Sequence, residues 1–349
     1  MEKINLSKPL QKDWIAGQES GIIYNVIQEN ADWSNYLPIE EYQRIFFDTF
    51  ACVTFSALNT IEIIINRMIA KNEISSDNLS WLKEKGYLDE NNLINFSDRF
   101  TANMSNTTKM GNFLTAVGDS INNNGLVPES AFKGSEATSW EDYYCIIGED
   151  LKDLGIEFKK RLQINYDWVL CGKENIESIK YYLKQSPIQI VSTCCPGWST
   201  DDIVKSCGIV SQHATVIYGY TDEYLKDFDS YSPFEKKLAI DYGIVWAIKY
   251  AVKEVEEEIV PKFDYVFKNK MFKGERSANV KNLQELLKLD GVYHKDIDCT
   301  GYYGNITQQA VKDFCIKYSV ASYWELAIVN GRWCGSKTIS KLNEIAKKY

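Results

Sequence analysis

The chain has 349 residues, enough for two domains, and its 45% hydrophobic and 25% charged content is that of an ordinary globular protein. A net charge of -9 argues against nucleic acid or an anionic membrane as a partner, because phosphate groups are bound by basic surfaces. The first residues lack the apolar run of a signal peptide, and no apolar run has the uninterrupted length of a membrane span. We therefore expect a protein that is cytoplasmic when made and not inserted in a membrane.

Helical periodicity dominates the first half of the chain and strand patterns the second. Helices are predicted over residues 50–72, 78–86, 97–105, 111–123, 148–162 and 173–185. Strands, rich in β-branched and aromatic residues, are predicted over residues 188–195, 213–220, 224–231 and 236–251. This order predicts an α+β domain with a helical lobe and an antiparallel β lobe, and a cleft between two such lobes is the expected place for a site.

A change of character near residue 260 predicts a domain boundary. The charged run there contains Pro261 and precedes fresh helical periodicity. We expect a first domain over 1–262, a linker over 263–276 and a second domain over 277–349.

The nine cysteines fit neither a zinc ribbon nor a full disulfide framework. Their number is odd, and no two CxxC pairs occur together. Adjacent Cys194 and Cys195 are either vicinal partners or, as we favour, two small residues on a buried strand. We expect a reduced chain with mostly structural thiols.

A cysteine near the start of the first predicted helix is the candidate nucleophile. Asp48 or Thr49 can cap that helix, which places Cys52 in the first turn, where free N–H groups and the helix dipole favour a thiolate. The chain has only two histidines, and His213 on a predicted strand can serve as the base, with Asp229 orienting its ring. Taken singly, a cysteine, a histidine or an aspartate at such positions more often has a structural role than a catalytic one, so only the three together indicate a catalytic site.

Three segments in order resemble papain-like cysteine peptidases: CVTFSALN, HATVIYGY and FDSY, which begin at residues 52, 213 and 228. The resemblance implies that Cys52 attacks a peptide carbonyl, His213 transfers the proton and Asp229 orients the imidazole. It also implies that Gln43 forms an oxyanion hole with the Cys52 backbone N–H, although Gln43 lies farther ahead of the cysteine than the family spacing. Asp229 stands where the family has Asn.

The same resemblance extends to the substrate groove. SDRFTANMSNTTKMGNFLTAV, from residue 97, is similar to the groove wall of the family, so Gly111 and Asn112 are expected to bind substrate. No cofactor is implied. HKDIDC offers possible metal ligands in His294, Asp296, Asp298 and Cys299, but their spacing fits no zinc or calcium loop, so we expect a solvated turn and no metal.

The C-terminal segment resembles a small three-helix peptidoglycan-binding domain. The matching positions are Val280, Leu283, Gln284, Leu287, Gly291, Thr300, Gly301, Tyr302, Gly304, Thr307, Ala310, Val311 and Phe314. The resemblance implies the bacterial cell wall as a partner.

These features together predict a thiol hydrolase of peptide bonds held at the cell wall. Its substrate is expected to be a polypeptide or a stem peptide of peptidoglycan. The alternative is a catalytically inactive wall-binding or virion structural protein. A wall-directed module without a leader suggests a phage origin, with action after lysis or from within a phage particle.

Overall fold

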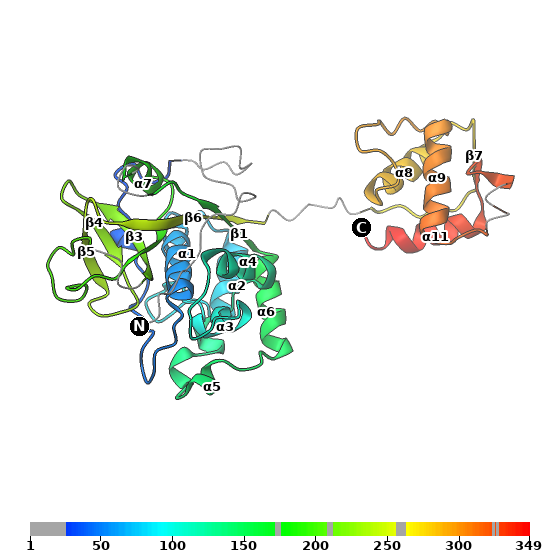
Figure 1. The fold of residues 1–349 in the computed structure, drawn as a ribbon. Helices are drawn as coiled ribbons and strands as arrows, with labels where there is room; N and C mark the ends of the chain where they lie inside the picture. Colours follow the sequence, from blue (N-terminus) through cyan, green and yellow to red (C-terminus); the bar gives the residue numbers. More distant parts are fainter. Residues whose placement is uncertain (1–25, 172–175, 208–211, 256–262, 323–324, 326–327) are drawn as a thin grey trace. The chain divides into compact units, whose positions relative to one another are not determined.

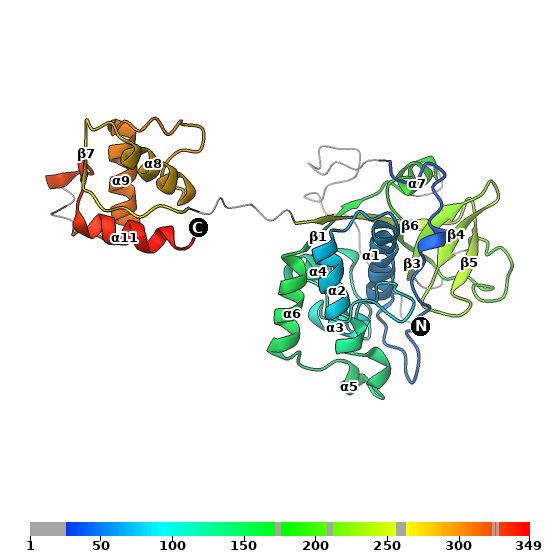
Figure 2. The same ribbon diagram turned by 180° about the vertical axis from the view of Figure 1, so that it is seen from behind.

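The computed structural model describes residues 26–171, 176–207, 212–255, 263–322, 325 and 328–349. The chain divides into two compact units, residues 1–256 and 257–349, drawn from opposite sides in Figures 1 and 2. Each unit has its own hydrophobic core and is described by itself.

The helices of the first unit are α1 (Cys52–Ala70), α2 (Ser76–Glu84), α3 (Asp98–Met104), α4 (Leu114–Asn124), α5 (Trp140–Tyr143), α6 (Glu149–Lys159) and α7 (Ile176–Leu183), with short 3-10 turns η1 (Ser34–Tyr36), η2 (Glu129–Ala131) and η3 (Gly134–Glu136). Helices α1 to α6 gather on one side, whereas α7 packs on the other face of the sheet (Figure 1), and the short helix α5 was not predicted from the sequence. Helix α1 packs against strands β3 and β6 and against helices α3 and α4, so it lies at the centre of the unit (Figure 1). It has the length and apolar character of a membrane span, but 94% of its apolar window is buried within the protein.

A six-stranded sheet forms the other side. Its strands are β1 (Leu162–Trp168), β2 (Ile188–Thr193), β3 (Gln212–Tyr220), β4 (Tyr224–Phe228), β5 (Glu235–Ala239) and β6 (Ile244–Glu254). They pair in the order β1-β6-β2-β3-β4-β5, and every pair is antiparallel. The first unit is therefore α+β, with a helical part and an antiparallel sheet.

Two features of the sheet differ from the sequence prediction. Strand β1 was not predicted, because its pairing partner, β6, lies far along the chain and its register, from Leu162↔Glu254 onward, is invisible to local patterns. The single strand predicted over 236–251 is two strands, β5 and β6, separated by a turn in which the Tyr242 N–H donates to the Ala239 carbonyl (2.8 Å).

The second unit contains helices α8 (Ala278–Leu289), α9 (Asn305–Lys317) and α11 (Ser336–Ala346) among its described residues. Strands β7 (Met271–Phe272) and β8 (Trp333–Cys334) form a short antiparallel pair. Phe267 and Met271 are buried in this core, so the segment 263–276, predicted as a linker, packs as part of the second unit.

Candidate active site

The turn before α1 holds the candidate nucleophile in place. Phe50 has a φ of 54°, a left-handed conformation that non-glycine residues adopt at a cost of about 1 kcal/mol or more. Its backbone N–H donates to Asp48 Oδ1 at 2.9 Å. Helix α1 then begins at Cys52, with Ala51 as the N-cap and no side-chain cap, so the prediction that Asp48 or Thr49 caps the helix is wrong. Asp48 instead stabilises the turn, which still leaves Cys52 as the first helical residue.

His213 and Asp229 come together through the pairing of β3 with β4. His213 lies near the start of β3, and Asp229 follows the last residue of β4, whose Phe228 pairs with Val216. The distance from His213 Nε2 to Asp229 Oδ1 is 2.6 Å, and both side chains are buried. Cys52 and His213 both line a cleft of about 730 Å³. Of the three residues predicted from the sequence, Cys52 and His213 thus share one cavity, and buried Asp229 contacts His213 without lining it.

The second carboxylate oxygen of Asp229 is held by two residues that sequence reasoning missed. Trp198 Nε1 and Lys236 Nζ each donate to Asp229 Oδ2 at 2.8 Å. Lys236 is buried, and its ammonium also donates to the Tyr231 carbonyl at 2.6 Å. On β5, Lys236 faces the same side as buried Leu238, and this alternation along the strand could have indicated that Lys236 is buried. A lysine in a short edge strand nevertheless predicts a side chain that faces solvent.

Charge controls the protonation of this pair. Burial acts to raise the pKa of Asp229, but His213 and Lys236 outweigh it and lower that pKa to about 2. Burial acts to lower the pKa of His213, but Asp229 and then Cys52 outweigh it and raise that pKa well above the ordinary histidine value. An imidazolium is therefore favoured beside an ionised carboxylate.

Gln43 reaches the cleft, but its donors are engaged. Its Nε2 donates to Asp48 Oδ1 at 3.1 Å and to the Tyr231 hydroxyl at 2.7 Å, while Ser230 Oγ donates to its Oε1 at 2.8 Å. Gln43 lines the same cleft as Cys52. The longer spacing is thus bridged by the turn at 44–49, and Gln43 can bind an oxyanion only by giving up one of these hydrogen bonds.

The two predicted substrate-binding residues have different positions. Gly111 lines the cleft and has a φ of 82°, in the region that favours glycine. Asn112 does not line it, because its Nδ2 donates to the Ser105 carbonyl, Ser105 Oγ and Thr107 Oγ1, each at 3.0 Å. Asn112 therefore fixes the turn that presents Gly111.

A disulfide closes the loop that carries Trp198. Cys195 is bonded to Cys207, whereas Cys194 is free and lines the cleft. The prediction of a fully reduced chain is wrong at this pair, and Cys194 and Cys195 are not joined to each other. The physical reason is that the loop folds back and brings the Cα atoms of Cys195 and Cys207 within 5.7 Å, which residue spacing cannot reveal.

The turn at HKDIDC is exposed, with His294 Nδ1 3.6 Å from Asp296 Oδ2. Among the described residues, no group of three or more His, Cys, Asp or Glu side chains is placed to hold a metal ion.

Residues 276–314 match a family model described as "Putative peptidoglycan binding domain". The match covers α8 and most of α9, the two helices whose positions carried the sequence resemblance. No curated protein matches the chain.

Solved structures to which the chain is similar include papain-like cysteine proteases. Xylellain, a cysteine protease from Xylella fastidiosa, has 12% identity and a TM-score of 0.48, covering 73% of this chain and 96% of that one. Bromelain from Ananas comosus has 13% identity and a TM-score of 0.43, covering 63% and 97%. Procathepsin L 3 from Tenebrio molitor has 12% identity and a TM-score of 0.45, covering 68% and 73%. At these scores the likeness adds nothing to the argument for the site, which rests on the contacts above.

Proposed function

We propose that the first unit is a papain-like cysteine peptidase and that the second unit holds it at peptidoglycan of the bacterial cell wall. The observation that carries the proposal is the buried 2.6 Å hydrogen bond between His213 and Asp229 beside a cleft that Cys52 and His213 both line. A cysteine at a helix N-terminus, a histidine and a group that orients it are the parts that thiol hydrolysis needs.

In the proposed mechanism, Cys52 attacks the peptide carbonyl as a thiolate while His213 carries the proton. The tetrahedral oxyanion is stabilised by N–H groups of the first turn of α1, which have no partner within the helix, and by Gln43 once it exchanges a hydrogen bond. His213 then protonates the leaving amine, and water hydrolyses the acyl-enzyme with His213 as base. Asp229 keeps the imidazole in the useful orientation throughout.

Two substrate classes fit this mechanism. The family match at residues 276–314 favours a stem peptide of peptidoglycan, because a wall-binding unit concentrates the peptidase on that polymer. The cleft by itself fits any extended polypeptide. The competing role, an inactive wall-binding protein, draws support from the engaged donors of Gln43.

The test is selective alkylation of Cys52 by iodoacetamide at mildly acidic pH, where ordinary thiols react slowly. We expect Cys52 to react first, and His213→Ala to abolish the selectivity. Cys194→Ala is the matched control, since Cys194 is a second free cysteine that lines the same cleft. Equal labelling of Cys52 and the other free cysteines would remove the catalytic proposal. Parallel digests of casein and purified peptidoglycan then separate the two substrate classes.

A further inference from the structure

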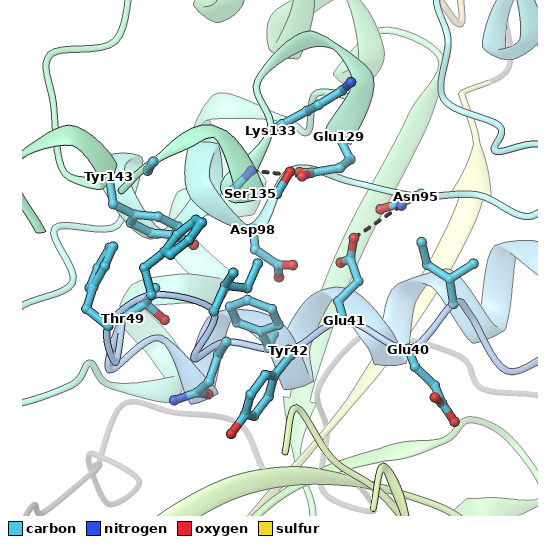
Figure 3. A pocket seen from close by; sticks show the side chains of 18 residues that line it. Glu40, Glu41, Tyr42, Thr49, Asn95, Asp98, Glu129, Lys133, Ser135 and Tyr143 are labelled. Carbon is cyan, nitrogen blue, oxygen red and sulfur yellow. Dashed lines mark hydrogen bonds between the residues drawn. The ribbon is translucent and has the colours of Figure 1, made fainter. Parts of the chain in front are cut away.

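A second cavity, of about 420 Å³, lies beside the cleft in the first unit. Tyr42 and Gln43 line both cavities, so the two are neighbours across this segment of the chain. The second cavity, which we call the acidic pocket, is lined by Glu41, Asp98, Glu129 and Tyr143, by one basic residue, Lys133, and by other polar and apolar residues. Glu41, Asp98 and Glu129 face a common space in Figure 3, whereas Glu40 points away from it.

The carboxyl groups of the acidic pocket form no ion pair within the described residues, although Lys133 lines the pocket and its charge acts to lower the pKa of Glu129. None of the ion pairs among the described residues involves Glu41, Asp98 or Glu129, and none involves Glu62, a buried acid of α1. Asn95 Nδ2 donates to Glu41 (3.2 Å), the Phe96 N–H to Glu62 (2.8 Å) and the Gly134 N–H to Glu129 (2.8 Å), and the carboxyl groups of Glu41 and Asp98 are hydrogen-bonded to each other. Four acids so placed, with one lysine at the pocket wall, favour the binding of a further positive charge.

An independent observation points to a ligand-binding role for the pocket. Tyr143 is 2% exposed and lines the pocket, and its hydroxyl has no hydrogen-bond partner among the described residues. A buried hydroxyl without a partner costs about 1–3 kcal/mol, so such groups are rare unless something binds them. Glu129 Oε2 and Asn95 Oδ1 are unpaired in the same way, which gives three oxygen atoms ready to accept hydrogen bonds around one cavity.

We propose that the acidic pocket binds an ammonium or guanidinium group carried on an apolar stem, as in a lysine or arginine side chain of a peptide. The carboxyl groups and the Tyr143 hydroxyl accept the N–H donors of the cation. The stem lies along Ile45 and Phe46, which are 54% and 64% exposed at the pocket wall. A metal ion fits less well, because these acids do not form a ligand set of three in the described part of the chain.

Protons balance much of the negative charge of the acidic pocket. Burial, and then the charge of Glu41, raises the pKa of Glu129 to about 8, and burial raises the pKa of Glu41, Glu62 and Asp98 as well. The charged and titratable groups that act on this set are Lys133, Glu136, Asp89 and Tyr143, and of these only Lys133 is basic. An arriving cation therefore displaces protons, and its affinity rises with pH by up to about tenfold per pH unit for each proton displaced.

The position of the pocket next to the cleft suggests which peptide it takes. A peptide bound in the cleft can place a basic side chain across Tyr42 and Gln43 into the acidic pocket. This last step rests on the proposed peptidase function, whereas cation binding does not.

Calorimetric titration of the full-length Cys52→Ala protein, which binds without turnover, tests the inference. The probes are Nα-acetyl-lysine methylamide and Nα-acetyl-arginine methylamide, with the neutral Nα-acetyl-norleucine methylamide as the reference. We expect a basic probe to bind about tenfold or more tightly than the reference, with proton release seen as a dependence of the heat on buffer ionisation.

Variants show whether binding occurs in this pocket. Glu41→Gln, Asp98→Asn and Tyr143→Phe should each weaken the basic probe severalfold or more without weakening the reference, and exposed Glu90→Gln should change neither. Tyr143→Phe is decisive because it removes only a hydroxyl that has no partner in the empty pocket, so folding is retained. Equal binding of basic and neutral probes, or Ca²⁺ binding without amine binding, would overturn the inference. Amine binding by a protein that cleaves no peptide would overturn only the proposed peptidase function.

Discussion

Lys236 is expected to balance the charge that Asp229 brings to the proposed triad. With Cys52 as thiolate and His213 as imidazolium, the buried row of thiolate, imidazolium, carboxylate and ammonium alternates in sign and is neutral overall. Removing Asp229 alone or Lys236 alone leaves one net charge buried. Removing both restores neutrality, so Asp229→Asn and Lys236→Met should compensate each other.

The magnitude follows from the contacts. Breaking a buried ion pair by removing one partner costs about 3–5 kcal/mol of unfolding free energy, and contacting residues couple by about 0.5–3 kcal/mol. Asp229 donates no proton but accepts a charge-assisted hydrogen bond from His213 at 2.6 Å, a contact that contributes about 1.5–3 kcal/mol. Its loss should lower the pKa of His213 by about one to two pH units. Lys236→Met should raise the pKa of His213, because a positive charge beyond the carboxylate is removed.

Asp227 does not reverse the rise in the pKa of His213 that is expected for Lys236→Met. This buried acid lies across from Lys236 in the β4–β5 pairing, and burial, then the charge of Asp229, raises its pKa to about 7. Removing Lys236 takes away a charge that lowers the pKa of Asp227, so this acid becomes still more protonated and adds no new charge at pH 6.

NMR titration of labelled histidine is a direct assay, because the chain has only two histidines and exposed His294 serves as the internal reference. The expected order of the His213 pKa is Lys236→Met, then wild type, then the double variant, then Asp229→Asn as the lowest. Urea unfolding of the same four proteins gives the coupling free energy. Strictly additive losses of stability, together with an unchanged His213 titration in Lys236→Met, would refute the charge balance.

Three further predictions concern Glu129, Gln43 and the disulfide. Glu129→Gln should raise the unfolding free energy by about 3–4 kcal/mol more at pH 8 than at pH 5 in chemical denaturation, because the folded state holds a proton up to about pH 8 that the unfolded state releases above its ordinary pKa of 4.5; an equal gain at both pH values would contradict this. Gln43→Ala should slow peptide hydrolysis by about 10²- to 10³-fold, whereas Tyr231→Phe, which frees one Gln43 donor, should cost less than about tenfold; similar rates for both variants would exclude Gln43 from the oxyanion hole. Cys207→Ser should lower the unfolding free energy by about 3 kcal/mol, because the substitution opens the loop of 12-residue separation that the disulfide closes. Thermal melting with and without reductant measures this loss, and a melting temperature equal to that of the wild type would contradict the prediction.

Much of the arrangement around Cys52 could be predicted from the sequence because it depends on local signals. The helix from Cys52 and the strand containing His213 each have a strong periodicity or a recognisable segment, whereas Asp229, predicted inside a strand over 224–231, follows the end of β4 at Phe228. Gln43 lines the cleft despite its unusual spacing, because residues 44–49 form a turn in which the Thr49 N–H donates to the Gln43 carbonyl (3.4 Å); its role at an oxyanion stays a prediction.

The remaining features depend on contacts between distant residues. Strand β1 exists because β6 offers it a partner, and Lys236 is buried because Asp229 neutralises it, so neither follows from its own neighbours in the chain. The acidic pocket gathers Glu41, Asp98 and Glu129 from three separate segments, each of which reads in isolation as an ordinary polar position. Similarly, the pairing of Cys195 with Cys207 depends on how one loop folds back.

The sulfur atoms of the proposed site have opposite redox requirements: Cys195 and Cys207 must be oxidised to close their loop, whereas Cys52 must be reduced. Trp198, which donates to Asp229, lies within the disulfide-closed loop, whereas Cys52 must stay a free thiol to act. A strongly reducing medium keeps Cys52 free but opens the loop behind Asp229, and a strongly oxidising one preserves the loop but converts an accessible thiolate to sulfenic acid or a mixed disulfide. Activity should therefore pass through a maximum as the concentration of a small thiol is raised, so the surroundings in which the protein acts have an upper as well as a lower limit of reducing power.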